Sequence, residues 1–259
     1  MNRNKLFHIP RPAKKPRLRL FCFPFAGGSA SVFQSWPAYF CDEVELVLVQ
    51  APGRGARLVE PAHDNMTDLV DELMAHAGFI TSLPYVVFGH SLGSRVAFEL
   101  CNRLAKVQLP LPRFFIGSGS RAPHLASLKK PTYDLPDAEF MQELSELNGT
   151  PKEVLHNHEL MQLLLPLLRA DFKIADTYQA QAVQHPFPIW VFHGEQDVGI
   201  TADQLQSWTE LSSVECTFSY FPGDHFFVME HSNRVVPQVV AVTQQVLSRL
   251  PAGDSVVMV

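Results

Sequence analysis

Six short runs of apolar residues recur along the chain, each bounded by polar or turn-forming positions. They cover residues 18–23, 45–50, 85–88, 113–117, 189–192 and 217–221. Most are continuously apolar rather than alternating, which is typical of strands that are buried on both faces of a parallel sheet. Between them lie segments with helical spacing, such as residues 66–80, where Leu69, Leu73 and Ala77 share one face. Strands that alternate with helices predict an α/β fold with a mostly parallel, doubly wound sheet.

One connection, at about residues 120–188, is far longer than a crossover between parallel strands requires. The segment contains signals for a helix over residues 137–147, a capping box at residues 150–153, and one or two helices over residues 158–178, where Pro166 marks a kink or break. We predict that this insertion forms a helical lid over the active site. A helical flap that packs the core and touches no substrate is the alternative.

The predicted lid carries more apolar side chains than packing on a sheet requires. We therefore predict that several of them bind substrate, together with one aromatic residue from an early loop. These candidates are Phe25, Phe140, Met141, Leu144, Leu163, Leu164, Leu167 and Phe172.

Composition places the chain among ordinary globular proteins. Its 259 residues suffice for one α/β domain with an insertion, and 46% are hydrophobic while 18% are charged. The formal net charge of −5 gives no reason to expect a nucleic-acid partner. No apolar stretch reaches transmembrane length, and the first twenty residues lack a signal-peptide core. We expect a cytoplasmic protein with no membrane partner.

Charge and proline content mark the expected domain boundaries. Residues 1–16 are rich in lysine and arginine and are broken by prolines, which predicts a flexible basic arm. Electrostatic steering of an acidic protein partner is a further interpretation of this arm. Residues 17–250 form the predicted domain, and residues 251–259 a C-terminal tail. Nothing in the pattern of cysteine and histidine suggests a metal or a cofactor.

The pentapeptide Gly-His-Ser-Leu-Gly at residues 89–93 directly follows the apolar run 85–88 and precedes a helical pattern at residues 95–101. A G-x-S-x-G sequence between a strand and a helix is typical of a nucleophile elbow, a sharp turn that presents the serine at the edge of the sheet. Glycines suit such a turn because other segments approach it closely. The pattern therefore predicts Ser91 as a catalytic nucleophile.

Partners for this serine follow in the order that this kind of hydrolase uses, an acid and then a histidine. Asp197 ends the loop after the fifth apolar run, and His225 follows the sixth. The carboxyl ends of parallel strands meet at one edge of the sheet, so we expect both near the serine. We assign His225 as the general base and Asp197 as the acid that orients it. Asp224 and Glu195 are weaker candidates for the acid.

An oxyanion hole requires two N–H donors beside the nucleophile. Leu92 follows the serine at the start of a helix and is the first predicted donor. Ala26 is the second, from the glycine-rich loop at residues 23–29, and Phe25 is the alternative. His90 and His193 also lie within motifs, and we interpret them as packed or hydrogen-bonded neighbours of the site.

Four segments together resemble the type II thioesterases, the stand-alone editing enzymes of nonribosomal peptide and polyketide synthesis. They are residues 23–29, 50–57, 88–94 and 223–227, and the resemblance covers about residues 18–250. It implies an α/β-hydrolase fold with a helical lid. It also implies a serine hydrolase that releases acyl or aminoacyl groups from the phosphopantetheine arm of a carrier protein, with no cofactor of its own.

Some features leave alternatives open. Ala51 stands where the family usually has leucine, which is a mild change. For Arg54 and Arg57 in the same segment, we favour structural salt bridges over substrate contact. An acyltransferase, a general carboxylesterase and a catalytically silent carrier-binding module are the rival functions, and a monomer is expected.

Overall fold

Within the residues that the computed structural model describes (5–127, 130–147 and 157–251), seven strands form one sheet. The strands are β1 (Phe7–His8), β2 (Leu18–Phe23), β3 (Val44–Val49), β4 (Tyr85–His90), β5 (Phe114–Ser118), β6 (Ile189–Gly194) and β7 (Cys216–Phe221). They lie in the order β1-β3-β2-β4-β5-β6-β7, and only the β1–β3 pair is antiparallel. The mostly parallel sheet confirms the predicted fold class.

The N-terminal segment differs from its prediction as a flexible arm. Phe7 pairs with Val49 as part of β1, and Leu6 is buried. The Phe7 ring packs against Phe21 and Phe79, so apolar contacts hold this part of the segment against the sheet. A strand of two residues is too short to leave a periodic signal in the sequence, which explains why it was not predicted.

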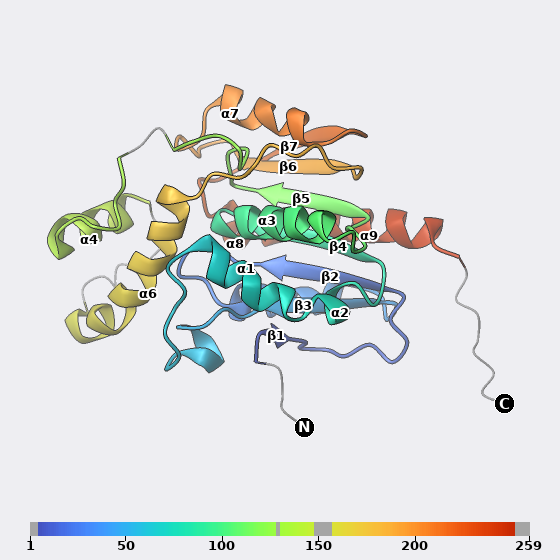
Figure 1. Cartoon of the computed structure of the whole chain (residues 1–259), viewed down its shortest axis with the longest axis horizontal. Coiled ribbons are helices and arrows are strands. Elements are labelled where there is room, and N and C mark those ends of the chain that lie inside the picture. Colours follow the sequence, from blue (N-terminus) through green and yellow to red (C-terminus); the bar gives the residue numbers. More distant parts are fainter. Residues whose placement is uncertain (1–4, 128–129, 148–156, 252–259) are drawn as a thin grey trace.

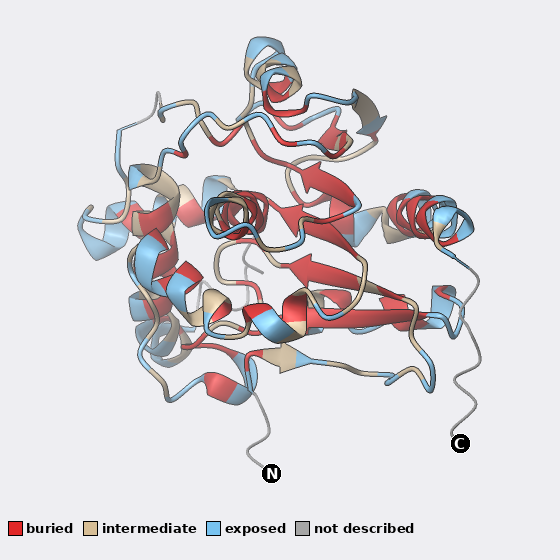
Figure 2. Cartoon of the chain, turned by 45° about the vertical axis from the view of Figure 1, so that its right-hand side comes forward, coloured by how far each residue is buried: buried red, intermediate tan, exposed pale blue. Residues whose placement is uncertain are grey.

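Helices cover both faces of the sheet (Figures 1 and 2). One face packs against α1 (Met66–Met74), α2 (Ala77–Ile80), α3 (Leu92–Lys106) and α7 (Ala202–Gln206), and the other against α8 (Phe227–Glu230) and α9 (Ser232–Arg249). In β4, Tyr85 and Val87 join the first core, whereas Val86 and Phe88 join the second. Burial on both faces accounts for the continuously apolar strands. No helix among the described residues is long and apolar enough to cross a membrane.

The helix predicted over residues 66–80 is two helices in the structure. The side chain of Asn65 accepts a hydrogen bond from the Asp68 N–H and begins α1. This helix ends at Met74, and α2 begins at Ala77. The apolar spacing continues across the break because both helices pack on the same core, so periodicity alone did not show it.

The long insertion contains α4 (Asp137–Glu146) and α6 (His158–Thr177). Both lie at the end of the sheet toward which the parallel strands point (Figure 1). Pro166 lies inside α6, which remains one helix. The predicted capping box at residues 150–153 and residues 252–259 of the predicted tail lie outside the described residues.

Core packing by α1 gives a stability prediction. Leu73 is fully buried between α1 and the sheet, and Leu73→Ala is expected to lower the free energy of unfolding by about 2–5 kcal/mol. Leu163 on α6 is 55% exposed, so Leu163→Ala is the matched control, with a change below about 0.5 kcal/mol. Urea unfolding of both variants measures the difference. Equal losses would contradict the packing described here.

Candidate active site

Ser91 occupies a strained turn between β4 and α3. Its φ and ψ angles are 54° and −118°, a region that residues with a side chain rarely adopt. Two glycines make the turn possible. A β-carbon on Gly89 would lie 2.6 Å from the carbonyl oxygen of Gly93, and one on Gly93 would overlap the carbonyl oxygen of Phe23. The turn is therefore packed directly against the end of β2, which holds the serine in one place.

The three residues predicted to act together meet at the carboxyl edge of the sheet. The Nε2 atom of His225 lies 2.8 Å from the Ser91 hydroxyl oxygen. The Nδ1 atom of His225 lies 2.7 Å from Oδ2 of Asp197. The Gly199 N–H donates to the other carboxylate oxygen of Asp197 at 3.0 Å. This arrangement can remove a proton from the serine hydroxyl and stabilise the resulting imidazolium.

Asp197 is held in its ionised form. Burial by itself would raise the pKa of this carboxyl, since only 8% of the residue is exposed. The hydrogen bond and the charge of His225, together with the Gly199 N–H, outweigh burial, so the pKa of Asp197 lies below its ordinary value. An ionised carboxylate keeps the proton of the neutral His225 ring on Nδ1 and leaves Nε2 free to accept one.

His90 supports the base from behind. Its Nε2–H donates to the backbone carbonyl of His225 at 2.8 Å, and its Nδ1 atom lies 2.8 Å from the Ser118 hydroxyl, which can donate to it. His90 is fully buried, and burial together with the nearby His225 lowers its pKa to about 3. The ring is therefore neutral at ordinary pH. This confirms the interpretation of His90 as a hydrogen-bonded neighbour of the site.

The two predicted oxyanion donors lie beside the nucleophile. Ala26 and Leu92 line the same cavity as Ser91. Within the described residues, neither backbone N–H makes a hydrogen bond, so both are available to a ligand. Gly27, by contrast, donates its N–H to Asp171. The alternative donor, Phe25, also lines the cavity, so the assignment of Ala26 and Leu92 stays a prediction that this geometry suits.

Arg54 and its ion-pair partner connect α6 to the glycine-rich loop at residues 23–29. Its guanidinium binds both carboxylate oxygens of Asp171 in α6, at 2.6 and 2.8 Å. The same carboxylate accepts the Gly27 N–H at 2.6 Å, and both charged side chains are buried. Arg57 forms ion pairs with Glu72 and with Glu60. The structural salt bridges favoured for both arginines are therefore present.

The active-site cavity has a volume of about 370 Å³ and is lined by the catalytic candidates and by residues of the insertion. Of the eight predicted substrate-binding residues, Phe25 and Phe172 line it. The six other apolar candidates do not: they are Phe140, Met141, Leu144, Leu163, Leu164 and Leu167. Most of these pack among themselves and against α6 in a small separate core, and Leu163 is exposed. Most of the extra apolar side chains of the insertion therefore pack its own helices against each other.

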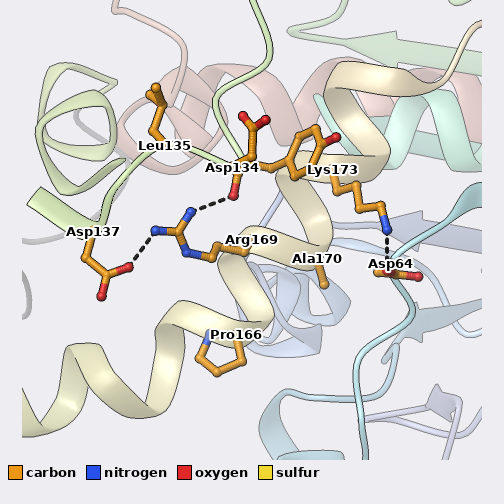
Figure 3. Close-up of a pocket in the computed structure, with 9 residues that line it drawn as sticks. Asp64, Asp134, Leu135, Asp137, Pro166, Arg169, Ala170 and Lys173 are labelled. Atoms are coloured by element: carbon orange, nitrogen blue, oxygen red, sulfur yellow. Dashed lines mark hydrogen bonds and ion pairs between the residues drawn. The ribbon is translucent and has the colours of Figure 1, made fainter. Parts of the chain in front are cut away.

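A second hollow, of about 590 Å³, lies on the outer side of α6 (Figure 3). Four of its charged side chains form two ion pairs. Arg169 donates to Asp137 and to the Tyr133 carbonyl oxygen, both at 2.5 Å, and Lys173 donates to Asp64 at 2.6 Å. None of the three catalytic candidates lines it. These contacts connect α6 to the start of α4 and to the loop that contains Asp64. The catalytic candidates lie in the first cavity.

No group of three or more His, Cys, Asp or Glu residues in the described parts of the chain is placed to hold a metal ion. The polar groups around Ser91 are a base, an acid and backbone N–H donors. What this site can do chemically is nucleophilic attack on a carbonyl carbon, followed by stabilisation of the oxyanion that forms.

The family model described as "Thioesterase domain" matches residues 18–243. Among curated proteins, the chain is 37% identical over 235 residues to the gramicidin S biosynthesis protein GrsT of Aneurinibacillus migulanus, covering 90% of this chain and 91% of that protein. It is 32% identical over 231 residues to the thioesterase PikA5 of Streptomyces venezuelae, covering 86% of this chain and 80% of that protein.

Solved structures show the same similarity. ClbQ from the colibactin NRPS/PKS pathway superimposes with a TM-score of 0.82 at 34% identity, covering 88% of this chain and 98% of that chain. The type II thioesterase BorB from the borrelidin biosynthetic cluster superimposes with a TM-score of 0.83 at 28% identity, covering 93% and 98%.

The ion pair between Arg54 and Asp171 gives a prediction about both stability and activity. Asp171→Asn leaves the buried guanidinium without a counter-charge, and we expect the free energy of unfolding to fall by about 3–5 kcal/mol. Asp64→Asn breaks the exposed pair with Lys173 and is the matched control, with little expected effect. The double variant Arg54→Met, Asp171→Leu should recover stability relative to Asp171→Asn but not the activity, because the anchor of Gly27 is lost. Equal unfolding by Asp171→Asn and Asp64→Asn would contradict this.

The buried, neutral His90 gives a prediction about pH. Its pKa rises from about 3 in the folded protein to the ordinary value of 6.5 on unfolding, so between these values the unfolded chain binds the extra proton. Stability is therefore lost as the pH falls below about 6.5, by at most about 1.4 kcal/mol per pH unit from this residue. His90→Gln should show a shallower decline than the wild type between pH 7.5 and pH 5.5, measured by urea unfolding. His8→Gln, at an exposed position, is the control for loss of a histidine. Coincident slopes for His90→Gln and the wild type would refute the assignment.

Proposed function

The chain belongs to the thioesterase family, and we propose that it is a type II thioesterase that releases acyl and aminoacyl groups from carrier proteins of nonribosomal peptide or polyketide synthesis. Its sheet and flanking helices have the α/β-hydrolase fold, and its activity is that of a hydrolase acting on thioesters. The observation that carries the proposal for this chain is the hydrogen-bonded series Ser91, His225 and Asp197 at the edge of a cavity.

In the first half of the proposed reaction, His225 removes the hydroxyl proton of Ser91 while Oγ attacks the thioester carbonyl carbon. The 2.8 Å separation of Nε2 and Oγ permits this transfer without rearrangement. The carbon–sulfur bond then breaks, and His225 returns the proton to the leaving thiolate. The acyl group remains on Ser91 as an oxygen ester, and the thiol of the arm departs.

The negative charge on the carbonyl oxygen is stabilised by the N–H groups of Ala26 and Leu92. Both are free of other hydrogen bonds within the described residues, and Leu92 lies at the N-terminus of α3, where the helix dipole favours an anion. The hydrogen bond from Gly27 to Asp171 fixes the loop that presents Ala26. Preorganised donors of this kind require no rearrangement when the charge appears.

In the second half, His225 removes a proton from water, and the resulting hydroxide attacks the acyl ester. The bond from the carbonyl carbon to Oγ breaks, and Ser91 takes the proton back from His225. The sum of the two halves is a thioester and water giving a carboxylic acid and a thiol. Asp197 stabilises the imidazolium in both halves and keeps its own charge.

Carrier proteins are the proposed partners, since the similar ClbQ comes from the colibactin NRPS/PKS pathway and the similar BorB from the borrelidin biosynthetic cluster. Hydrolysis of acyl groups from such carriers would free synthetases that are misprimed or stalled. A cavity bounded by the insertion suits this role, because the acyl group on a long flexible arm can enter while the carrier stays outside.

The test compares one acyl group on three leaving groups: a carrier-protein thioester, a thioester of N-acetylcysteamine and an oxygen ester. We expect the highest kcat/KM for the carrier thioester, and transfer to added alcohols or amines should be minor relative to free acid. Equal rates on the oxygen ester would indicate a general carboxylesterase, and predominant transfer an acyltransferase. Ser91→Ala should lower kcat by about 10³-fold or more.

The exposed Ser248 supplies the matched control, because Ser248→Ala makes the same chemical change on the surface of α9. It should retain wild-type kcat. Thermal unfolding of both variants verifies that they are folded. Substantial turnover by a folded Ser91→Ala variant would exclude the serine mechanism, and absence of any turnover by the wild type would favour a silent binding module.

A further inference from the structure

Two arginines line the same cavity as the nucleophile. Arg95 lies in the first turn of α3, which begins directly after Ser91, and it lines the cavity together with Ser91. Arg121 lies in the segment that follows β5 at the neighbouring strand end. Neither arginine takes part in the proposed chemical steps, and charged side chains are unusual in a cavity meant only for apolar acyl groups.

The hydrogen bonds of Arg95 use only part of its guanidinium. Its Nε–H donates to the Ser120 hydroxyl at 3.3 Å, and Nη1 donates to the backbone carbonyl of Ala175 in α6 at 2.7 Å. Both acceptors are uncharged. Within the described residues Nη2 makes no hydrogen bond, although only 9% of the residue is exposed.

The guanidinium of Arg121 makes fewer hydrogen bonds than that of Arg95. Its Nε–H donates to the carbonyl of Leu125 at 3.2 Å, and within the described residues neither terminal nitrogen has an acceptor. The negative charge of Asp176, which also lines the cavity, acts on Arg121 and on Arg95 and opposes the lowering of their pKa values. One carboxylate oxygen of Asp176 already accepts from the N–H and hydroxyl of Thr132, at 2.7 and 3.1 Å.

Neither guanidinium has a carboxylate within 4.0 Å among the described residues, although Asp176 and Glu143 line the cavity as well. Burial, and then the charge of Arg121, lowers the pKa of Arg95 to about 9, which leaves it charged at neutral pH. Burial likewise lowers the pKa of Arg121.

Buried charge is costly unless it is paired. Elsewhere in this protein the buried arginines obey that rule, since Arg54 pairs with Asp171 and Arg57 with Glu72. Arg95 departs from this rule in a cavity where a ligand can supply the missing charge, and the half-buried Arg121 lies in the same cavity.

We propose that Arg95 and Arg121 bind a carboxylate at the far end of the acyl group, so that the preferred substrates are half-thioesters of dicarboxylic acids. The inference rests on the proposed thioesterase function and names its substrate class. A guanidinium presents a planar fork of N–H donors that matches a carboxylate, and within the described residues the two arginines retain several unused donors in the cavity that Ser91 lines. The phosphate of the carrier arm is the other anion in such substrates. It leaves with the thiol, whereas the acyl group stays in the cavity on Ser91.

The test uses thioesters of N-acetylcysteamine, which carry no phosphate. One substrate bears an adipyl group with its free carboxylate, and the other bears the same chain ending in a primary amide of nearly equal size. We expect the wild type to favour the carboxylate by at least about tenfold in kcat/KM, because the neutral amide leaves the charges of the buried Arg95 and the half-buried Arg121 unpaired. Arg121→Gln and Arg95→Gln should reduce this ratio toward one, mainly through KM for the carboxylate.

Arg113→Gln, at an exposed position outside the cavity, is the matched control and should keep the wild-type ratio. Arg95 also holds α6 through Ala175, so circular dichroism verifies folding, and Arg121→Gln is decisive if Arg95→Gln does not fold. A wild-type ratio near one, or a high ratio that persists in a folded Arg121→Gln variant, overturns the proposal. An effect of Arg121→Gln seen only with carrier-bound thioesters would assign the arginines to the phosphate and overturn it too.

A second measurement separates this inference from the proposed function. The Ser91→Ala variant should bind the intact adipyl thioester at least about tenfold more tightly than the amide in calorimetry, and the added Arg121→Gln substitution should remove that preference. If the wild type hydrolyses neither thioester, the thioesterase proposal fails for this substrate class while the affinity ratio still decides the arginine site. Equal affinities would overturn the carboxylate site even if hydrolysis is efficient.

Discussion

The buried ion pair between Arg54 and Asp171 connects the parts of this protein that must stay in register for catalysis. Its carboxylate is in α6, its guanidinium follows β3, and the Gly27 N–H bound to the same carboxylate lies in the loop after β2. Two charges removed from water are tolerated only when the geometry is good and the remaining donors are satisfied, and here three N–H groups converge on one carboxylate. The insertion, the loop after β2 and the sheet are thus joined at one point, next to Ala26, which lines the cavity with Ser91.

The same insertion decides what the cavity offers to a substrate. Its large apolar side chains, such as Phe140 and Leu144, pack in a small core between α4 and α6. The surface left facing Ser91 is mixed, with Phe172 beside charged groups from α3 and α6. An insertion that must support its own helices away from the main core uses its apolar residues for that packing, and polar residues then remain to line the cavity.

Two histidines with different surroundings divide the work at the elbow. His225 lies between a carboxylate and a hydroxyl, where a proton can be received and returned. His90 lies behind it, fully buried and neutral, and spends its hydrogen bonds on the backbone of His225 and on Ser118. A cation behind His225 would oppose the formation of an imidazolium there, so the burial that keeps His90 neutral suits the proposed role of His225 as the base.

The sequence by itself determined the strands of the parallel sheet, the elbow at Ser91 and the order of acid and histidine, because each depends on local patterns of burial and turn geometry. It did not show β1, which has only two residues and exists through its pairing with β3. It also did not distinguish residues of the insertion that line the cavity from those that pack against one another, since both are apolar at helical spacing. Only the tertiary structure decided that, and only it placed Asp171 against Arg54, 117 residues apart, and left Arg95 and Arg121 facing a cavity with no carboxylate paired to them among the described residues. Such contacts arise where distant segments meet, and no local pattern encodes them.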